Sequence, residues 1–152
     1  MSLFSNRARS RRSAIAAVTL LTAGVLGAVG AGSAGADTAA AQQKKVIASS
    51  VLGSDYKYTL TALRSTEDQY AATVELQVYK QKNGAWKETD LVTVGDVDGW
   101  FWFPLTGSGA VCEFSTASTE PAPLAVSLLV TPSIGCSEVT NYLVKEGRVF
   151  AA

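Results

Sequence analysis

Apolar and polar residues alternate in short runs over most of the chain that follows residue 45. In one run Tyr56, Tyr58, Leu60 and Ala62 are separated by lysine and threonine, and residues 73–79 repeat this spacing with three aliphatic residues. A period of two residues is typical of a half-buried β-strand. Beyond residue 45 no window shows the 3.6-residue period of an amphipathic helix. The pattern therefore predicts an all-β domain.

Turn signals divide this region into strands. Asn83-Gly84 separates the run 73–79 from residues 85–89, and this dipeptide tolerates the positive φ angles of a type I′ turn, so it predicts a β-hairpin. Further strands are predicted at 91–94 (separate, or the second half of the hairpin arm), 99–103, 110–116, 124–131 and 139–145. Seven or eight short strands favour a single antiparallel β-sandwich, which we expect to be immunoglobulin-like.

The first 36 residues have a different composition. Residues 1–13 contain four arginines and no acid, residues 14–32 are uncharged and rich in Ala, Val, Leu and Gly, and Ala34-Gly35-Ala36 follows. This order is typical of a secretory signal peptide and predicts cleavage before Asp37. A membrane-anchoring helix is the alternative, and the glycines and threonines within residues 14–32 argue against it. We expect the mature protein to be secreted and not to be bound to a membrane.

The export route stays open, because Ser10-Arg11-Arg12-Ser13 resembles a twin-arginine signal but is followed by Ala14. An arginine-rich start before an Ala/Gly-rich stretch resembles the signals of proteins exported by actinobacteria. This resemblance covers the signal alone and implies nothing about the mature domain.

The charges are unevenly distributed between these parts. The whole chain has 13 basic and 13 acidic residues, but the 116 residues from Asp37 onward have 9 basic and 13 acidic ones. Such a mildly acidic domain argues against nucleic-acid binding, which needs clustered lysine and arginine.

We expect a signal peptide at 1–36, a flexible lead-in at 37–44 and a β-sandwich at 45–150, in a monomer or weak dimer.

Cys112 and Cys136 are the two cysteines of the chain. An even pair in an exported protein predicts a disulfide, which here would close a loop of 25 residues counting both cysteines. The Cys-x-x-Cys spacing of redox-active pairs is missing. The disulfide is therefore expected to be structural.

The chain has no histidine, and this excludes several kinds of chemistry. Ser-His-Asp and Cys-His catalysis need a histidine base, and two cysteines alone cannot complete a tetrahedral zinc site. We therefore expect no enzyme activity and no cofactor.

Asp96 and Asp98 resemble the start of a calcium loop, with Asp90 six positions earlier, but the later glutamate and flanking helices are missing. They are weak metal candidates, and an acidic turn is the favoured interpretation.

The run Trp100-Phe101-Trp102-Phe103 is the first candidate binding feature. In a strand the two tryptophans face one way and the two phenylalanines the other, and a sandwich core accepts one pair. The other pair is covered by a loop, buried in a dimer or used on a ligand, and indole rings suit sugar stacking. Trp86 either packs across the hairpin on Tyr79 or joins such a site.

The loop that ends at Cys136 is the second candidate. Ile134 would be presented there with the disulfide as a brace, as in loops of secreted protease inhibitors, although a connection pinned for stability alone is the commoner case. We expect non-catalytic binding of an extracellular protein partner. The alternatives are a polysaccharide-binding module that uses Trp100, Trp102 and Trp86, and a protease inhibitor that uses Ile134.

Overall fold

The computed structural model describes residues 41–152. The predicted signal peptide, its cleavage site and residues 37–40 of the predicted lead-in lie outside the described residues. Among residues 41–152, no helix is long and apolar enough to cross a membrane.

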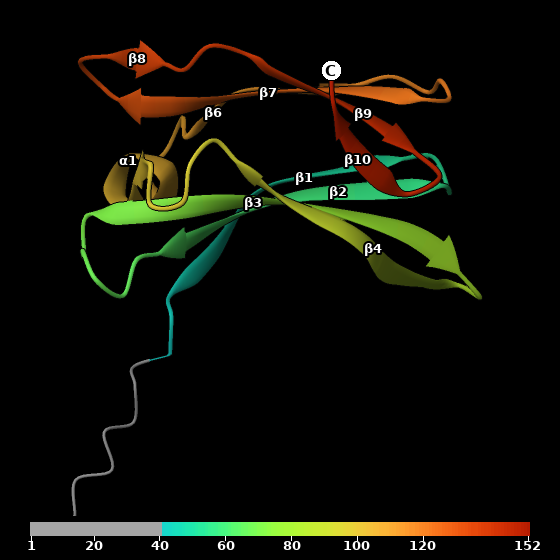
Figure 1. The fold of residues 1–152 in the computed structure, drawn as a ribbon, viewed down its shortest axis with the longest axis horizontal. Coiled ribbons are helices and arrows are strands. Elements are labelled where there is room, and N and C mark those ends of the chain that lie inside the picture. The colour runs from blue at the N-terminus through green and yellow to red at the C-terminus, as the bar shows by residue number, and fades with distance from the viewer. Residues whose placement is uncertain (1–40) are drawn as a thin grey trace, which may run out of the picture. The chain divides into compact units, whose positions relative to one another are not determined.

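The described chain forms two antiparallel β-sheets that lie one above the other (Figure 1). The first sheet has the order β1 (Lys44–Leu52), β2 (Tyr56–Arg64), β3 (Ala71–Lys82) and β4 (Ala85–Val94), and β5 (Trp100–Phe101) also pairs with β3. The second sheet has the order β10 (Arg148–Ala151), β9 (Thr140–Lys145), β7 (Ala122–Thr131) and β6 (Val111–Thr116), and β8 (Gly135–Cys136) also pairs with β7. The short helix α1 (Trp102–Thr106) leads from the first sheet to the second.

The predicted all-β sandwich is thereby confirmed, but an immunoglobulin-like strand order is not. An immunoglobulin sandwich combines early and late strands in each sheet. Here each sheet consists of strands that follow one another along the chain. The reason lies in the connections of the first sheet, which span residues 53–55, 65–70 and 83–84. Such short connections favour pairing with the neighbouring strand over a crossing to the other sheet.

The predicted hairpin is confirmed. Asn83 and Gly84 have φ angles of 54° and 77°, as a type I′ turn requires. β4 runs without interruption from residue 85 to residue 94. Residues 91–94 are therefore the second half of the hairpin arm and not a separate strand.

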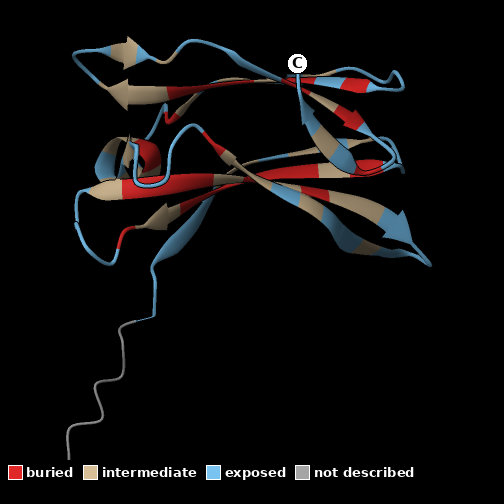
Figure 2. Cartoon of the chain, viewed as in Figure 1, coloured by how far each residue is buried: buried red, intermediate tan, exposed pale blue. Residues whose placement is uncertain are grey.

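The core consists of the alternate side chains that the sequence pattern marks. Figure 2 shows buried residues along both sheets. The fully buried aliphatic and aromatic side chains include Tyr58, Leu60, Val74, Leu76 and Val78 from the first sheet and Leu124, Val126, Leu128 and Val144 from the second. Burying one such aliphatic side chain contributes about 1.5–3 kcal/mol, so this shared layer is the main source of stability.

The predicted strand 99–103 is wrong beyond Phe101, because the chain turns there into α1. Pro104 does not end a strand but lies within the first turn of this helix, where the missing N–H has no intrahelical partner to lose. The turn brings Leu105 into the core with no exposed surface. Thr106 Oγ1 donates to the carbonyl of Trp102 at 2.9 Å and closes the turn.

The predicted disulfide is confirmed. It joins Cys112 in β6 to Cys136 in β8, and both strands pair with β7. Both cysteines are exposed at the surface. A disulfide within reach of solvent fits a non-reducing environment.

Reduction of this disulfide is expected to destabilise the domain. Releasing a 25-residue loop restores chain entropy to the unfolded state and costs about 3 kcal/mol of stability. For a domain of this size we expect the melting temperature to fall by about 10 °C, as measured by circular dichroism with and without reductant. The Cys112→Ala/Cys136→Ala variant is the control, since reductant should not shift its melt. An unchanged melt of the native chain under reductant would show that the bridge adds no stability.

The Tyr58 hydroxyl provides a second stability test. It is buried, and neither it nor the Thr116 hydroxyl has a hydrogen-bond partner among residues 41–152. Burial raises the pKa of Tyr58 to about 12, and the nearby Thr116 hydroxyl opposes this rise only in part. The unfolded chain therefore loses this proton near pH 10 while the folded chain keeps it, and stability falls as the pH rises from 10 to about 12.

Tyr58→Phe should remove part of this alkaline loss. At pH 7 the variant should be as stable as the native protein or more stable, within about 1 kcal/mol, because it removes an unpaired buried hydroxyl. Between pH 10 and 12 its melting temperature should fall less than that of the native chain. Parallel melting curves of the two proteins over this pH range would contradict the assignment.

Candidate functional site

Three aromatic side chains are exposed near one end of the first sheet. Tyr70 and Phe103 are each 57% exposed and Phe101 is 45% exposed. The Tyr70 and Phe103 rings lie with their centroids 6.0 Å apart at an angle of 51°. The backbone places them together, because Phe101 pairs with Ala71 and the Trp102 N–H donates to the Tyr70 carbonyl at 2.8 Å.

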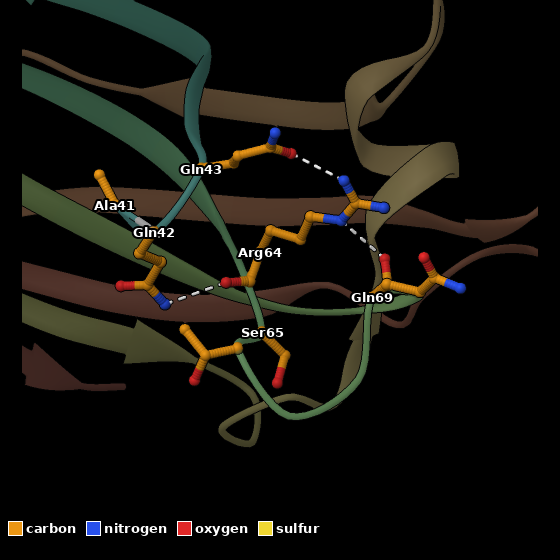
Figure 3. A pocket seen from close by; sticks show the side chains of 7 residues that line it. Ala41, Gln42, Gln43, Arg64, Ser65 and Gln69 are labelled. Carbon is orange, nitrogen blue, oxygen red and sulfur yellow. Dashed lines mark hydrogen bonds between the residues drawn. The ribbon is translucent and has the colours of Figure 1, made fainter. Parts of the chain in front are cut away.

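Arg64, the last residue of β2, is held beside these aromatic rings. Its guanidinium carbon lies 5.6 Å from the centroid of the Trp102 ring and 5.5 Å from that of Phe103. Its Nε donates to the Gln69 carbonyl at 2.8 Å, and its Nη1 donates to Gln43 Oε1 at 2.7 Å (Figure 3). A guanidinium has five donors, so these two bonds leave three for water or a ligand. We call Arg64, Tyr70, Phe101 and Phe103 the aromatic–arginine patch.

An open pocket of about 480 Å³ borders this patch. Its lining consists of residues 41–43, Arg64, Ser65, Thr66 and Gln69, so five of the seven lining residues carry an amide or a hydroxyl group (Figure 3). The carbonyl of Gln43 accepts the Arg64 N–H at 2.8 Å, and Gln42 Nε2 donates to the Arg64 carbonyl at 3.1 Å. These two bonds connect the end of the predicted lead-in to Arg64. Gln42 and Gln43 extend the contact of β1 with β2, and Lys44 already belongs to β1.

The tryptophans do not form the exposed surface that the polysaccharide-binding alternative requires. Trp100 and Trp102 are partly buried and pack against the core. Trp100 Nε1 also donates to the Val94 carbonyl at 2.6 Å, which satisfies the polar atom of the indole. The two tryptophans thus contact the core while Phe101 and Phe103 are exposed, which is the division that alternating side chains predict. The exposed pair at 100–103 is thus the phenylalanines.

Trp86 is also partly buried, and it lies opposite Gln81 in the hairpin, whereas Tyr79 lies opposite Glu88. No aromatic contact joins Trp86 to Tyr79 within residues 41–152. Tyr79 instead packs with Lys57, whose ammonium nitrogen lies 5.5 Å from the ring centroid.

Ile134 is 70% exposed, as the inhibitor hypothesis requires, but it lies in a tight turn. Its N–H donates to Thr131 Oγ1 at 3.1 Å, and the next residue, Gly135, has a φ of 88°. A protease accepts its substrate in an extended form on both sides of the cleaved bond. The turn at residues 131–135 does not present Ile134 in that form.

The acidic residues near position 96 serve as structural acceptors. Asp98 accepts hydrogen bonds from Ser65 Oγ at 2.9 Å and Thr73 Oγ1 at 3.2 Å, which ties the turn after β4 to the start of β3. Asp90 accepts the Val149 N–H at 2.8 Å and so connects β4 with β10. Within residues 41–152, no three His, Cys, Asp or Glu side chains, Asp96 included, are close enough together to hold a metal ion.

Tyr70 and Arg64 belong to the patch, but the sequence pattern does not mark either of them. Neither belongs to an apolar run, and a single exposed aromatic residue in a turn carries no periodic signal. The pairing of β3 with β5 brings the following turn of α1 beside them, so that Phe103 contacts Tyr70 and lies next to the Arg64 guanidinium.

Comparisons with known proteins identify no relative of this chain. It matches no protein-family model, no curated protein and no solved structure. We therefore infer its function from the chemistry of its own surface.

Arg64→Ala should loosen the patch and destabilise the domain. The substitution removes two hydrogen bonds and two cation–π contacts, which together are worth about 1–3 kcal/mol at a partly exposed site. We expect a loss of this size in urea denaturation, and faster hydrogen exchange in residues 65–70. Arg148→Ala, in the exposed part of β10, is the matched control. Equal stability of the two variants would contradict the role of Arg64.

Proposed function

We propose that this protein acts outside the cell by binding another protein through the aromatic–arginine patch, without catalysing a reaction. The observation that carries the proposal is that the exposed rings of Tyr70 and Phe103 contact each other beside a fixed arginine, with the exposed Phe101 on the adjoining strand. Residues that contribute most to protein–protein affinity are commonly aromatic or arginine. Large exposed aromatic side chains that gather at one place are a usual mark of an interaction site.

The rigidity of the patch supports this function. Phe103 belongs to a helical turn that Leu105 anchors in the core, and Tyr70 directly precedes β3. Two neutral acceptors and two rings hold the guanidinium of Arg64. Because these groups are already ordered, a partner would lose little conformational entropy on their account when it binds.

The extracellular location is part of the proposal. The composition of residues 1–36 predicts a cleaved export signal, and the exposed disulfide fits a non-reducing compartment. Non-catalytic action is proposed because the chain lacks a histidine base and because the pocket beside the patch is lined by amide and hydroxyl side chains, one arginine and one alanine.

Site-specific photo-crosslinking tests the proposed interface. A benzoylphenylalanine placed at position 103 should form a covalent adduct of defined mass when the full chain is secreted by its native host and irradiated. The same residue at position 150 is the matched control, because Phe150 is 51% exposed on β10 of the second sheet. The adduct at position 103 should weaken severalfold when Tyr70→Ala is added.

Three outcomes would contradict the proposal. These are no protein adduct at position 103, equal adducts at positions 103 and 150, and an adduct at position 103 that Tyr70→Ala leaves unchanged. The first would show that no protein contacts the patch, and the other two would show contact without specificity.

A further inference from the structure

A second surface lies on the outer face of the first sheet, away from the core. It is an open groove of about 410 Å³ that crosses β1, β2 and β3. Thr59 and Thr61 of β2 line it, because they alternate with the buried Tyr58, Leu60 and Ala62. The second sheet covers the opposite face of these strands, so the groove is open to solvent.

The floor of the groove is polar and ordered. Thr59 and Thr61 are only 6% and 5% exposed, and each hydroxyl donates to Gln77 Oε1 at 2.8 Å. Two donors on one oxygen fix the amide, so its two N–H donors and the lone pairs of the threonine hydroxyls are left for a ligand. Closely spaced donors and acceptors of this kind match the hydroxyl groups of a saccharide.

The ends of the groove carry lysines. Lys57 is aligned with Tyr79 across β2 and β3, and its ammonium nitrogen lies 5.5 Å from the Tyr79 ring centroid. Lys44 of β1 is aligned with Leu63, six residues farther along β2, which corresponds to roughly 20 Å of strand. A chain that follows β2 would meet one lysine at each end and the Thr–Gln floor between them.

The charge of the groove differs from that of the domain around it. The lining includes both lysines and no aspartate or glutamate. Glu75 is aligned with Thr61 on the same face but is not part of the lining. Glu88 is aligned with Tyr79 on that face and is not part of the lining either. Residues 37–152 nevertheless contain 13 acidic and 9 basic side chains. A basic groove on an acidic domain is complementary to an anionic ligand.

A peptide fits this groove less well than a saccharide. Extended peptides bind sheets chiefly by adding a strand to an unpaired edge. β2 forms the floor and is paired on both sides, with β1 and with β3. The floor therefore offers side-chain hydroxyls and an amide but no free backbone ladder.

We propose that the groove over β1–β3 binds an anionic polysaccharide. Lys44 and Lys57 hold its acidic groups, Thr59, Thr61 and Gln77 hold its hydroxyls, and the Tyr79 ring contacts a sugar face. This site uses none of the residues of the aromatic–arginine patch, so it is independent of the proposed protein binding.

Isothermal titration of the full chain with three polymers tests the site at fixed ionic strength. Polygalacturonate provides carboxylates, dextran sulfate provides sulfates, and dextran is neutral. We expect binding of at least one of the two polyanions and none of dextran, and the tighter polyanion identifies the acidic group. Lys44→Gln/Lys57→Gln should weaken binding at least tenfold, and Gln77→Leu should weaken it severalfold with the charge unchanged.

The matched control is Lys87→Gln/Lys145→Gln, which removes the same charge at two exposed positions outside the groove. It should keep nearly full affinity. Equal losses in the two double variants would overturn the proposal, because binding would then follow net charge alone. Binding of dextran as tight as that of the polyanions, full affinity in Gln77→Leu, or no binding of either polyanion would also overturn it. None of these outcomes affects the crosslinking test at position 103.

Discussion

One face of β3 is buried against the second sheet, and this burial determines where the other strands and both candidate surfaces lie. Val74, Leu76 and Val78 are completely buried, and they share the core with Leu124, Val126 and Leu128 of β7. Because side chains alternate along a strand, this burial fixes the opposite face of β3 toward solvent. A slip of one residue would exchange the two faces and expose the core, so the register is strongly determined.

Both candidate surfaces follow from that register. β3 presents Gln77 and Tyr79 on the outer face, where β2 adds the two threonines of the groove floor. At its beginning β3 pairs with β5, which sets Phe101 beside Ala71 and brings Tyr70 close to α1. One strand thus positions an aromatic surface near its start and a polar groove along its outer face. The disulfide acts elsewhere, on strands that pair with β7.

Much of this architecture could be predicted from the sequence, and the failures have identifiable causes. The sequence pattern predicts β2, β3 and the hairpin correctly, from the alternation at 56–62 and 73–79 and from the turn at Asn83-Gly84. The run 100–103 is apolar at every position, so it carries no period that separates a strand from the helical turn found there. The tryptophans were candidates because indole rings suit sugar stacking, and the run itself does not say which aromatic pair is exposed. Arg64 and the groove residues depend on strand pairing, which the local pattern does not contain.

Nuclear Overhauser effects in the native protein test which side chains of β3 point into the core and which point to solvent. We predict effects between the methyl groups of Leu76 and those of β7, and effects between the Gln77 side-chain amide and the side chains of Thr59 and Thr61. No effect is expected between Gln77 and the core residues of β7. A Gln77 amide close to Leu124, Val126 or Leu128 would place the wrong face of β3 outward and would contradict the core and both surfaces together.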